Sequence, residues 1–454
     1  RIAKDGTTST VILAGEMLQN AWQLILQGIH PSTIARGYRK SEQYLLQCIS
    51  EIKFDSDDKM KSSVVKTSLA GKGHSSMQET IARVSLDAVQ MVADIDSTID
   101  ISKIKLVSQT GGKVEDSKVF RGLMIPKKRI SSDMDKEVNR GKIILIDGGL
   151  EKSNVATDLK LNVTAVGVLE SFRQEERNML KRQVDNLVEH GVTVLACRES
   201  IDDEIKNYLS ENGIQAFRRV ARSDLNMLAR VCDATLVNSV DSLTSNDLGS
   251  FIVSKNTTIE GKDFWIVEGD GKAATIIAKA STLDVVGEVE RCFDDSLGVS
   301  VQLIENGSVV CGGGASYVAL ARRLRRYAET IPGREQLAVE AYADAIEVIV
   351  RVLAENAGID PITTLLDVVA KQTNTNSDYI GIDLSTGAPS DMVKLGILEP
   401  EGIVKQAIIG ATEVAISILR IDDVLWAKQE MQMPDMPDDE TVSYTHLRAH
   451  ETTD

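Results

Sequence analysis

The sequence predicts a multidomain α+β and α/β protein, in which helical blocks at both ends enclose a small linking unit and an α/β block. The chain has 454 residues, which is too long for a single hydrophobic core. Apolar residues recur with helical spacing near both ends, whereas from about residue 140 short apolar runs alternate with helical segments. Such alternation is typical of strands joined by helices and favours parallel pairing with right-handed crossovers.

The composition limits the classes of partner. The chain carries 51 basic and 67 acidic side chains, and the net charge of −16 argues against nucleic acid as a partner. Its five cysteines lack CxxC spacing, which disfavours a metal cluster or a disulfide framework and fits a reducing compartment. No apolar run looks long enough to cross a bilayer and no signal peptide is evident, so we expect a cytoplasmic protein without a membrane partner.

Two helices are predicted at the N-terminal end, over residues 11–27 and from residue 31 to about residue 49. Gly28 ends the first helix and Pro31 begins the second. Their apolar faces are expected to consist of Val11, Leu18, Ala21 and Ile25 in the first helix, and of Ile34, Tyr38, Leu45 and Ile49 in the second.

The stretch from Asp5 to Thr10 precedes the first helix and reads Asp-Gly-Thr-Thr-Ser-Thr. Backbone N–H groups at a helix start lack intrahelical partners, and with the helix dipole they form a site suited to phosphate. Asp5 offers an oxygen ligand of the kind that Mg²⁺ prefers. An aspartate followed by hydroxyl residues is also an ordinary helix N-cap, so this motif alone leaves both interpretations open.

A turn is predicted at Thr67–Gly73, after a charged run at Asp55–Lys61 that marks a change of unit. Lys72 stands between two glycines there and could place its ammonium group on a terminal phosphate, although a solvated loop lysine is the alternative. A helix is expected over residues 81–92, followed by a strand at Gly122–Ile125.

The α/β block carries no glycine fingerprint for a dinucleotide, so it is interpreted as a scaffold or a polypeptide-binding surface. A helix is expected at Gln174–Glu189. The stretch from Asn162 to Asn178 fits neither period and suits a mobile apolar projection or an ordinary loop and helix start. Strands are predicted at Ile143–Ile146, Val192–Ala196, Gln215–Arg219, Ala234–Val237 and Phe264–Val267.

The C-terminal half offers two further candidates. Asp294 and Asp295 are predicted to open a helix. Gly312, Gly313 and Gly314 follow a short apolar run and precede another helix, which fits either a close backbone approach to a nucleotide or a flexible hinge. Three further helices are expected over residues 317–329, 335–356 and 403–419.

Several motifs, taken in order, resemble those of group II chaperonin subunits, and the variant is similar to archaeal thermosome subunits. They are Asp5–Ser9, Asp294–Leu297, Gly312–Ala315, Gly333–Leu337, Asn356–Pro361 and Leu419–Asp423. The resemblance covers about residues 5–432. It implies a mostly helical equatorial domain (1–58 and 314–442), a small intermediate domain (59–129 and 281–313) and an α/β apical domain with a helical protrusion (130–280).

The resemblance also implies a site for ATP and Mg²⁺. Asp5 is the expected metal ligand, and Asp295, ahead of Asp294, is expected to orient or deprotonate the attacking water. Lys72 is the expected sensor of the terminal phosphate. The other expected nucleotide contacts are Gly6, Thr7, Thr8 and Ser9 at the phosphate turn, Gly313 by its backbone, Asp383 at the base and Glu399 at the ribose.

The function implied by the resemblance is ATP-dependent folding of unfolded polypeptide clients, in a stacked double ring of homologous subunits closed by a lid near residues 162–178. A structural ring subunit that binds nucleotide without hydrolysing it, and a small-molecule phosphotransferase, are the alternatives. The resemblance implies a further phosphate loop before Asp5. We therefore expect this chain by itself to bind ATP poorly and also to assemble poorly. Residues 443–454 resemble a translated sequencing adapter and are expected to be a non-native tail.

Overall fold

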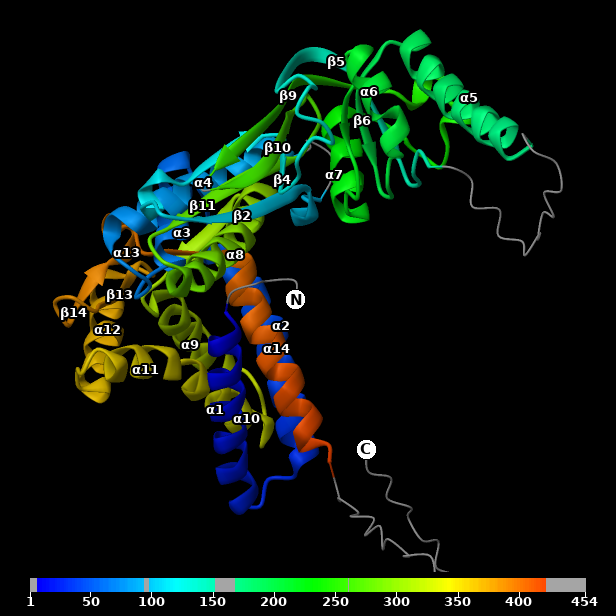
Figure 1. The fold of residues 1–454 in the computed structure, drawn as a ribbon. Helices are drawn as coiled ribbons and strands as arrows, with labels where there is room; N and C mark the ends of the chain where they lie inside the picture. Colours follow the sequence, from blue (N-terminus) through cyan, green and yellow to red (C-terminus); the bar gives the residue numbers. More distant parts are fainter. Residues whose placement is uncertain (1–5, 94–97, 152–167, 260, 422–454) are drawn as a thin grey trace, which may run out of the picture.

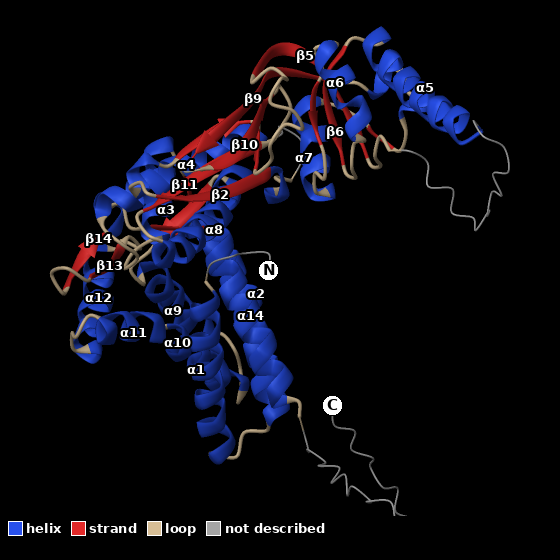
Figure 2. Ribbon diagram, viewed as in Figure 1, coloured by secondary structure: helices blue, strands red, loops and turns tan. Residues whose placement is uncertain are grey.

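The computed structural model describes residues 6–93, 98–151, 168–259 and 261–421. Figure 1 shows an elongated, bent molecule, with a helical block at one end and a sheet-and-helix block at the other. A third group of elements lies between them. Figure 2 shows that long strands occupy the middle and the far end, whereas the block that contains both α1 and α14 is nearly all helix. The first and last described helices therefore belong to one block.

The helical block is built from segments near both ends of the chain. α1 and α14 pack side by side, and α2 and α10 pack against them. Its helices are α1 (Thr7–Leu26), α2 (Pro31–Ile52), α9 (Ala315–Ala328), α10 (Glu335–Ile346), α11 (Val348–Asn356), α12 (Pro361–Thr375) and α14 (Glu401–Leu419). A hairpin of β13 (Ile380–Asp383) and β14 (Ala388–Asp391) and the short α13 (Met392–Leu395) follow α12.

Local signals explain the helix starts. Pro31 takes the first position of α2, where its missing N–H costs nothing, and His30 Nδ1 accepts the Ser32 N–H at 3.2 Å. At α12, Pro361 takes the same position, and the Asp360 carboxylate accepts the N–H groups of Ile362 and Thr363.

One predicted apolar face and one predicted helix need correction. In α2 the predicted face is buried, but in α1 Val11 is 71% exposed. The helix predicted over residues 335–356 is also two helices that meet at Glu347. In α1 the buried positions form one face of the helix, and Val11, two residues before Leu13 in the first turn, lies to the side of that face. These positions are Leu13, Ala14, Met17, Ala21 and Leu24.

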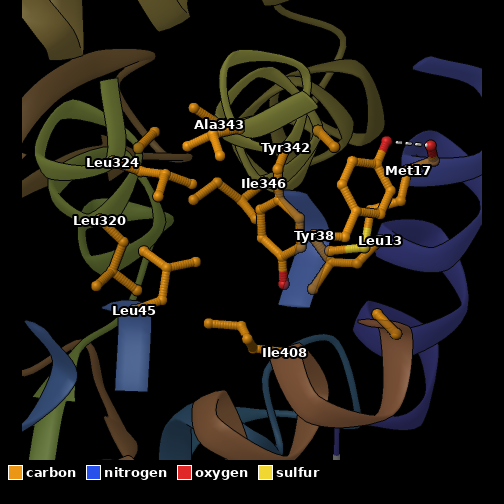
Figure 3. Close-up of a cluster of buried hydrophobic side chains, with 14 of the residues drawn as sticks. Leu13, Met17, Tyr38, Leu45, Leu320, Leu324, Tyr342, Ala343, Ile346 and Ile408 are labelled. Atoms are coloured by element: carbon orange, nitrogen blue, oxygen red, sulfur yellow. Dashed lines mark hydrogen bonds between the residues drawn. The ribbon is translucent and has the colours of Figure 1, made fainter. Parts of the chain in front are cut away.

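The core of this block joins the two ends of the chain (Figure 3). The rings of Tyr38 and Tyr342 meet edge to face, with centroids 5.2 Å apart. The Tyr38 hydroxyl donates to the Met17 carbonyl at 2.7 Å. The Tyr342 hydroxyl lies 2.6 Å from the Thr412 hydroxyl. These two buried hydroxyls are therefore satisfied where helices from both ends of the sequence meet.

The apolar helix α14 lies within this block. By length and composition it could span a membrane, since it has 19 residues and its most apolar window has a mean hydropathy of 1.5. This finding corrects the expectation that no apolar run is long enough. Nevertheless, Val404, Ala407, Ile408, Ala411 and Ala415 of α14 are buried in the shared core, as in a core helix of a globular domain.

The middle group surrounds a three-stranded sheet in the order β2 (Ile104–Thr110), β11 (Ala274–Ala280), β3 (Lys118–Arg121). Two 3₁₀ turns flank these strands, η1 (Ile101–Lys103) and η2 (Val114–Asp116). α4 (Ser75–Val92) and α8 (Leu283–Asn306) pack on the sheet, and α3 (Asp58–Ser68) packs on both helices. Asp294 and Asp295 lie in the middle of α8, so the prediction that they open a helix was wrong. Thr67 and Ser68 end α3 and are not part of a turn.

A small antiparallel sheet connects the middle group to the helical block. Its order is β1 (Phe54–Asp55), β12 (Ser308–Cys311), β15 (Leu398–Pro400). β12 runs directly into the three glycines before α9. Three distant parts of the chain meet here.

The far block contains a seven-stranded mixed sheet in the order β4-β10-β9-β5-β6-β7, with β8 paired to β5. Pairing is parallel between β5, β6, β7 and β8, but antiparallel between β5, β9, β10 and β4. The strands are β4 (Leu123–Ile125), β5 (Glu137–Ile146), β6 (Val192–Cys197), β7 (Gln215–Phe217), β8 (Leu236–Val237), β9 (Gly249–Ile259) and β10 (Lys262–Glu268). The other elements are α5 (Val168–Glu189), α6 (Asp203–Glu211), α7 (Arg222–Cys232), η3 (Val240–Ser242) and η4 (Ser245–Asp247).

The expectation of parallel pairing for Phe264–Val267 was therefore wrong. β9 ends at Ile259 and β10 begins at Lys262, a connection too short for a crossover, and the two strands form a hairpin. The predicted projection at 162–178 falls partly outside the described residues. Its described part, from Val168 onward, belongs to α5.

Candidate functional site

A cavity of about 700 Å³ opens between α3, the β13 strand and the segment before β15. Gly313, Asp383 and Glu399 line it, and these are three of the predicted nucleotide contacts. The other lining residues are Ser63, Lys66, Thr67, Ala70, Leu353, Ile382, Leu384, Ser385, Leu395, Gly396 and Ile397. Leucines from three separate elements give the cavity an apolar part, which suits a planar base.

A second cavity of about 140 Å³ adjoins the first, because Thr67 and Glu399 line both. Gly6 and Ser9, from the predicted phosphate turn, line this smaller cavity. The remaining lining residues are Val64, Ser68, Leu398, Pro400 and Ile403. Five of the predicted residues, from four distant segments, therefore lie along one continuous depression.

The start of α1 provides donors at the smaller cavity. The first backbone hydrogen bond of the helix runs from the Thr10 N–H to the Gly6 carbonyl at 3.0 Å, so the N–H groups of Thr7, Thr8 and Ser9 have no intrahelical acceptor. Gly6 has φ 81°, and a Cβ there would lie 2.7 Å from Ile403 Cγ2, so only glycine fits. A helix start with N–H groups of this kind can bind an anion, and the anion site expected at this turn stays a prediction.

The glycines before α9 are required by their protein neighbours. Gly314 has φ 74°, and an added Cβ would lie 2.3 Å from Val350 Cγ2. Gly313 has φ 59°, and its Cβ would lie 2.5 Å from Met392 Sδ, while its carbonyl accepts the Ile382 N–H at 2.9 Å. These contacts hold β12, α9 and the β13–α13 segment close together, which favours a fixed junction over the flexible hinge that the sequence left open.

Asp383 ends β13 at the edge of the larger cavity. Its carboxylate accepts the Ser385 hydroxyl at 2.6 Å, the Ser385 N–H at 3.0 Å and the Thr386 hydroxyl at 2.9 Å. The Ser385 hydroxyl bond, followed by the Ser385 backbone bond and the Thr386 hydroxyl bond, holds the pKa of Asp383 below its usual value. Asp383 thus shapes the loop at the cavity edge and stays anionic.

Glu399 lies at the boundary of both cavities. It sits on β15 opposite Val310 of β12. A Cβ at Gly312 would lie 3.2 Å from Glu399 Oε1, so the first of the three glycines leaves room for this carboxylate. A carboxylate in that position can accept hydrogen bonds from ribose hydroxyls.

Lys72 and Asp295 are brought together, but they do not line the two cavities. Lys72 Nζ lies 2.6 Å from Asp295 Oδ2, and the two side chains are 36% and 33% exposed. Neither residue is among those that line the two cavities. α8 therefore presents Asp295 to the Lys72 turn in this conformation.

The remaining predicted site residues either line neither cavity or lie outside the described residues. Thr7 and Thr8 lie on the same turn as Gly6, but they are exposed and line neither cavity. Asp5, the expected metal ligand, lies outside the described residues. Within the described ranges, no group of three or more His, Cys, Asp or Glu side chains could hold a metal ion. The expected Mg²⁺ ligation therefore stays a prediction.

The sequence reading missed the contribution of α3. Ser63, Lys66 and Thr67 lie at helical spacing on α3 and line the larger cavity, together with Ala70 in the turn that follows the helix. Because Thr67 had been interpreted as part of a turn, this face was not recognised. The apolar residues Leu353, Leu384 and Leu395 carry no distinguishing local signal, since each becomes part of the site only through tertiary packing.

Comparisons with known proteins agree on a family. The model of the TCP-1/cpn60 chaperonin family matches residues 1–429. The thermosome subunit of Methanopyrus kandleri is 41% identical over 434 residues, which cover 94% of this chain and 79% of that protein. The thermosome subunit of Pyrococcus horikoshii is 40% identical over 436 residues, with the same shares covered.

A solved structure is also similar. It is described as an open state monomer of a group II chaperonin from Methanococcoides burtonii, and it is 32% identical to this chain with a TM-score of 0.71. The match covers 92% of this chain and all of that one. The multidomain combination of helical and mixed-sheet parts is thus shared with group II chaperonins.

Proposed function

This chain belongs to the TCP-1/cpn60 chaperonin family, and from that membership we propose that it is an ATP-dependent chaperone subunit. The observation that carries the proposal is the joining of Gly6, Ser9, Gly313, Asp383 and Glu399 along two adjoining cavities. These residues come from four distant segments, and each had been predicted as a nucleotide contact.

The cavities suggest how ATP is oriented. The apolar walls formed by Leu353, Leu384 and Leu395 suit the base, and Glu399 suits the ribose hydroxyls. The phosphates are then directed to the start of α1, where Gly6 and Ser9 line the smaller cavity. Asp5 is the proposed Mg²⁺ ligand, and the ion would supply neutralisation of phosphate charge.

Asp295 is the proposed catalytic carboxylate, and Lys72 the proposed sensor of the terminal phosphate. Because neither residue lines the cavities, we propose that this conformation is an open one, like that of the similar structure. A movement of α8 toward the start of α1 would bring Asp295 to the attacking water, where it orients the water or accepts its proton.

The division into equatorial, intermediate and apical domains, with the boundaries given above, is part of the same proposal. Separate buried clusters support it, since one joins α1 and α2 to α9, α10 and α14, and two others lie on the faces of the seven-stranded sheet. The proposed partners are unfolded polypeptides, bound by the apical domain, and homologous subunits in a stacked double ring. The proposed location is the cytoplasm.

Steady-state ATP hydrolysis by the intact protein, compared with its Asp295→Ala variant, tests the proposal. We expect Mg²⁺-dependent turnover that collapses in the variant while nucleotide still binds. Equal turnover in both proteins would show that Asp295 is not the catalytic group. Binding without turnover in either protein would favour the alternative, a structural ring subunit that does not hydrolyse ATP.

A further inference from the structure

We propose that Gln78 is a positioning residue that fixes the turn carrying Lys72, so that Lys72 is held against Asp295. The inference rests on the proposed ATPase function for its role, but its structural basis is independent of nucleotide. Gln78 lies in the first turn of α4, and Lys72 lies in the turn that joins α3 to α4.

The side-chain amide of Gln78 faces three carbonyl oxygens of this turn. Nε2 lies 3.0 Å from the Leu69 carbonyl oxygen, 3.3 Å from that of Lys72 and 3.4 Å from that of Gly73. An amide NH₂ group carries two hydrogens, and carbonyl oxygens are acceptors only. One side chain therefore supplies donors to both ends of the Lys72 segment.

Backbone hydrogen bonds hold mainly the start of the turn, where the Leu69 and Ala70 N–H groups donate to the Lys66 and Thr67 carbonyls. The Lys72 N–H donates to the Leu69 carbonyl at 2.9 Å, and Gly71 and Gly73 flank Lys72 with φ 80° and 69°. Because glycine can adopt many backbone conformations, Gly71 and Gly73 allow the segment around Lys72 to adopt alternative conformations. An added anchor is therefore needed if Lys72 Nζ is to remain 2.6 Å from Asp295 Oδ2.

Hydrophobic packing fixes the residues on both sides of the turn, but it does not fix Lys72 within the turn. Leu69 is fully buried in the same cluster as Met77, Phe293 and Leu297, which join α4 to the segment of α8 around Asp295. Lys72 itself is partly exposed. Since the cluster sets the spacing of the helices, Gln78 has the narrower task of fixing the exposed part of the turn.

The role predicts a specific kinetic signature. Gln78 lines neither cavity, so Gln78→Met, which keeps the length of the side chain and removes its donors, should leave KM for ATP within about twofold. The kcat should fall roughly fivefold, the size expected for the loss of one or two neutral hydrogen bonds. In a Lys72→Met background, Gln78→Met should have no further effect on kcat, because the two residues act through the same group.

Gln90→Met is the matched control, since Gln90 is an exposed glutamine on the same helix, far from the turn. It should change neither kcat nor KM. A merely structural role for Gln78 would instead lower kcat by the same factor with and without Lys72, and that additivity would overturn the proposal.

Amide hydrogen exchange provides a readout that does not require turnover. In the full chain, Gln78→Met should speed exchange at the Lys72 amide roughly fivefold, while Gln90→Met leaves it unchanged. If wild-type protein lacks ATP turnover, the proposed function fails while exchange still decides the role of Gln78. If turnover is present and neither kcat nor exchange responds to Gln78→Met, the positioning role is wrong and the proposed function stands.

Discussion

Lys72, on the turn before α4, and Asp295, in the middle of α8, form an ion pair with Lys72 Nζ 2.6 Å from Asp295 Oδ2. Both side chains are about one-third exposed, and ion pairs at such positions contribute little to stability. The ion pair is therefore expected to contribute little to the free energy of unfolding, and its proposed role is in catalysis.

This distinction gives a prediction for Asp295→Ala. The free energy of unfolding should change by no more than about 1 kcal/mol, because water screens the pair. ATP turnover should fall by roughly two orders of magnitude or more. Denaturant unfolding and steady-state kinetics on the same preparations measure the two effects, and a stability loss of several kcal/mol would assign the pair a structural role.

A second prediction concerns the glycine before α9. Gly314 and Gly358 have similar positive φ, 74° and 71°, but a Cβ clashes with Val350 only at Gly314. Gly358→Ala should cost only the backbone term of roughly 1–2 kcal/mol. Gly314→Ala should cost a further ~1–3 kcal/mol for overpacking. Chemical denaturation measures both, and equal losses would mean that Val350 moves aside freely.

A third prediction concerns the buried hydroxyl pair Tyr342 and Thr412. Thr412 donates to the Ile408 carbonyl at 2.7 Å, so the Tyr342 hydroxyl is the donor in its 2.6 Å bond to Thr412. Thr412→Val leaves the Tyr342 hydroxyl buried without its acceptor and should cost about 1–3 kcal/mol. Adding Tyr342→Phe removes that orphan donor, so the double variant should be more stable than Thr412→Val alone. If the two substitutions simply add, the hydrogen bond is not the source of the loss.

A fourth prediction concerns the cysteines, all five of which are buried. Burial raises the pKa of Cys232 and, with lesser help from Asp391, Asp378 and Glu399, that of Cys311, in each case from 9.0 to about 12. In the folded protein at pH 8, a thiol-reactive disulfide should label none of the five rapidly, and unfolding should expose all of them. A cysteine that reacts at once in the native protein would contradict this prediction.

The same shifts set the sign of a pH effect. Between pH 9 and 12 these thiols stay protonated in the folded state and lose their protons in the unfolded state. The free energy of unfolding should therefore be fully retained below pH 9 and fall as pH rises toward 12. Denaturant titrations at pH 8, 9 and 10 measure the trend, and an increase in stability over that range would reverse the sign.

Helix boundaries marked by a single nearby residue could be predicted from the sequence. Pro31 and Gly28 marked real helix boundaries, and the face of α2 through Ile34 and Tyr38 is buried as expected. Position within a longer element was harder to predict. Asp295 was expected near a helix start, yet it lies in the middle of α8, because an acidic pair resembles a helix-start signal wherever it stands.

The site was predicted in part for the same reason. Gly6, Gly313 and Glu399 stood in recognisable motifs, whereas Leu353 of α11 and Leu395 of α13 come to line one cavity only through the tertiary fold. No local pattern carries that information. The antiparallel pairing of β9 and β10 likewise depends on the short connection between them, which the alternating pattern of the α/β block concealed.

The joining of both chain ends in one helical core also has a consequence for biosynthesis. Arg39 of α2 reaches Glu413 of α14, 374 positions later, at 2.7 Å. At a synthesis rate of about 5–20 residues per second, the partner of α2 emerges roughly 20–75 s after α2 itself. The seven-stranded sheet, whose strands lie between Leu123 and Glu268, is complete much earlier. Its block can therefore fold on the ribosome while α1 and α2 still expose their apolar faces, and this exposed surface favours aggregation until α14 has been made.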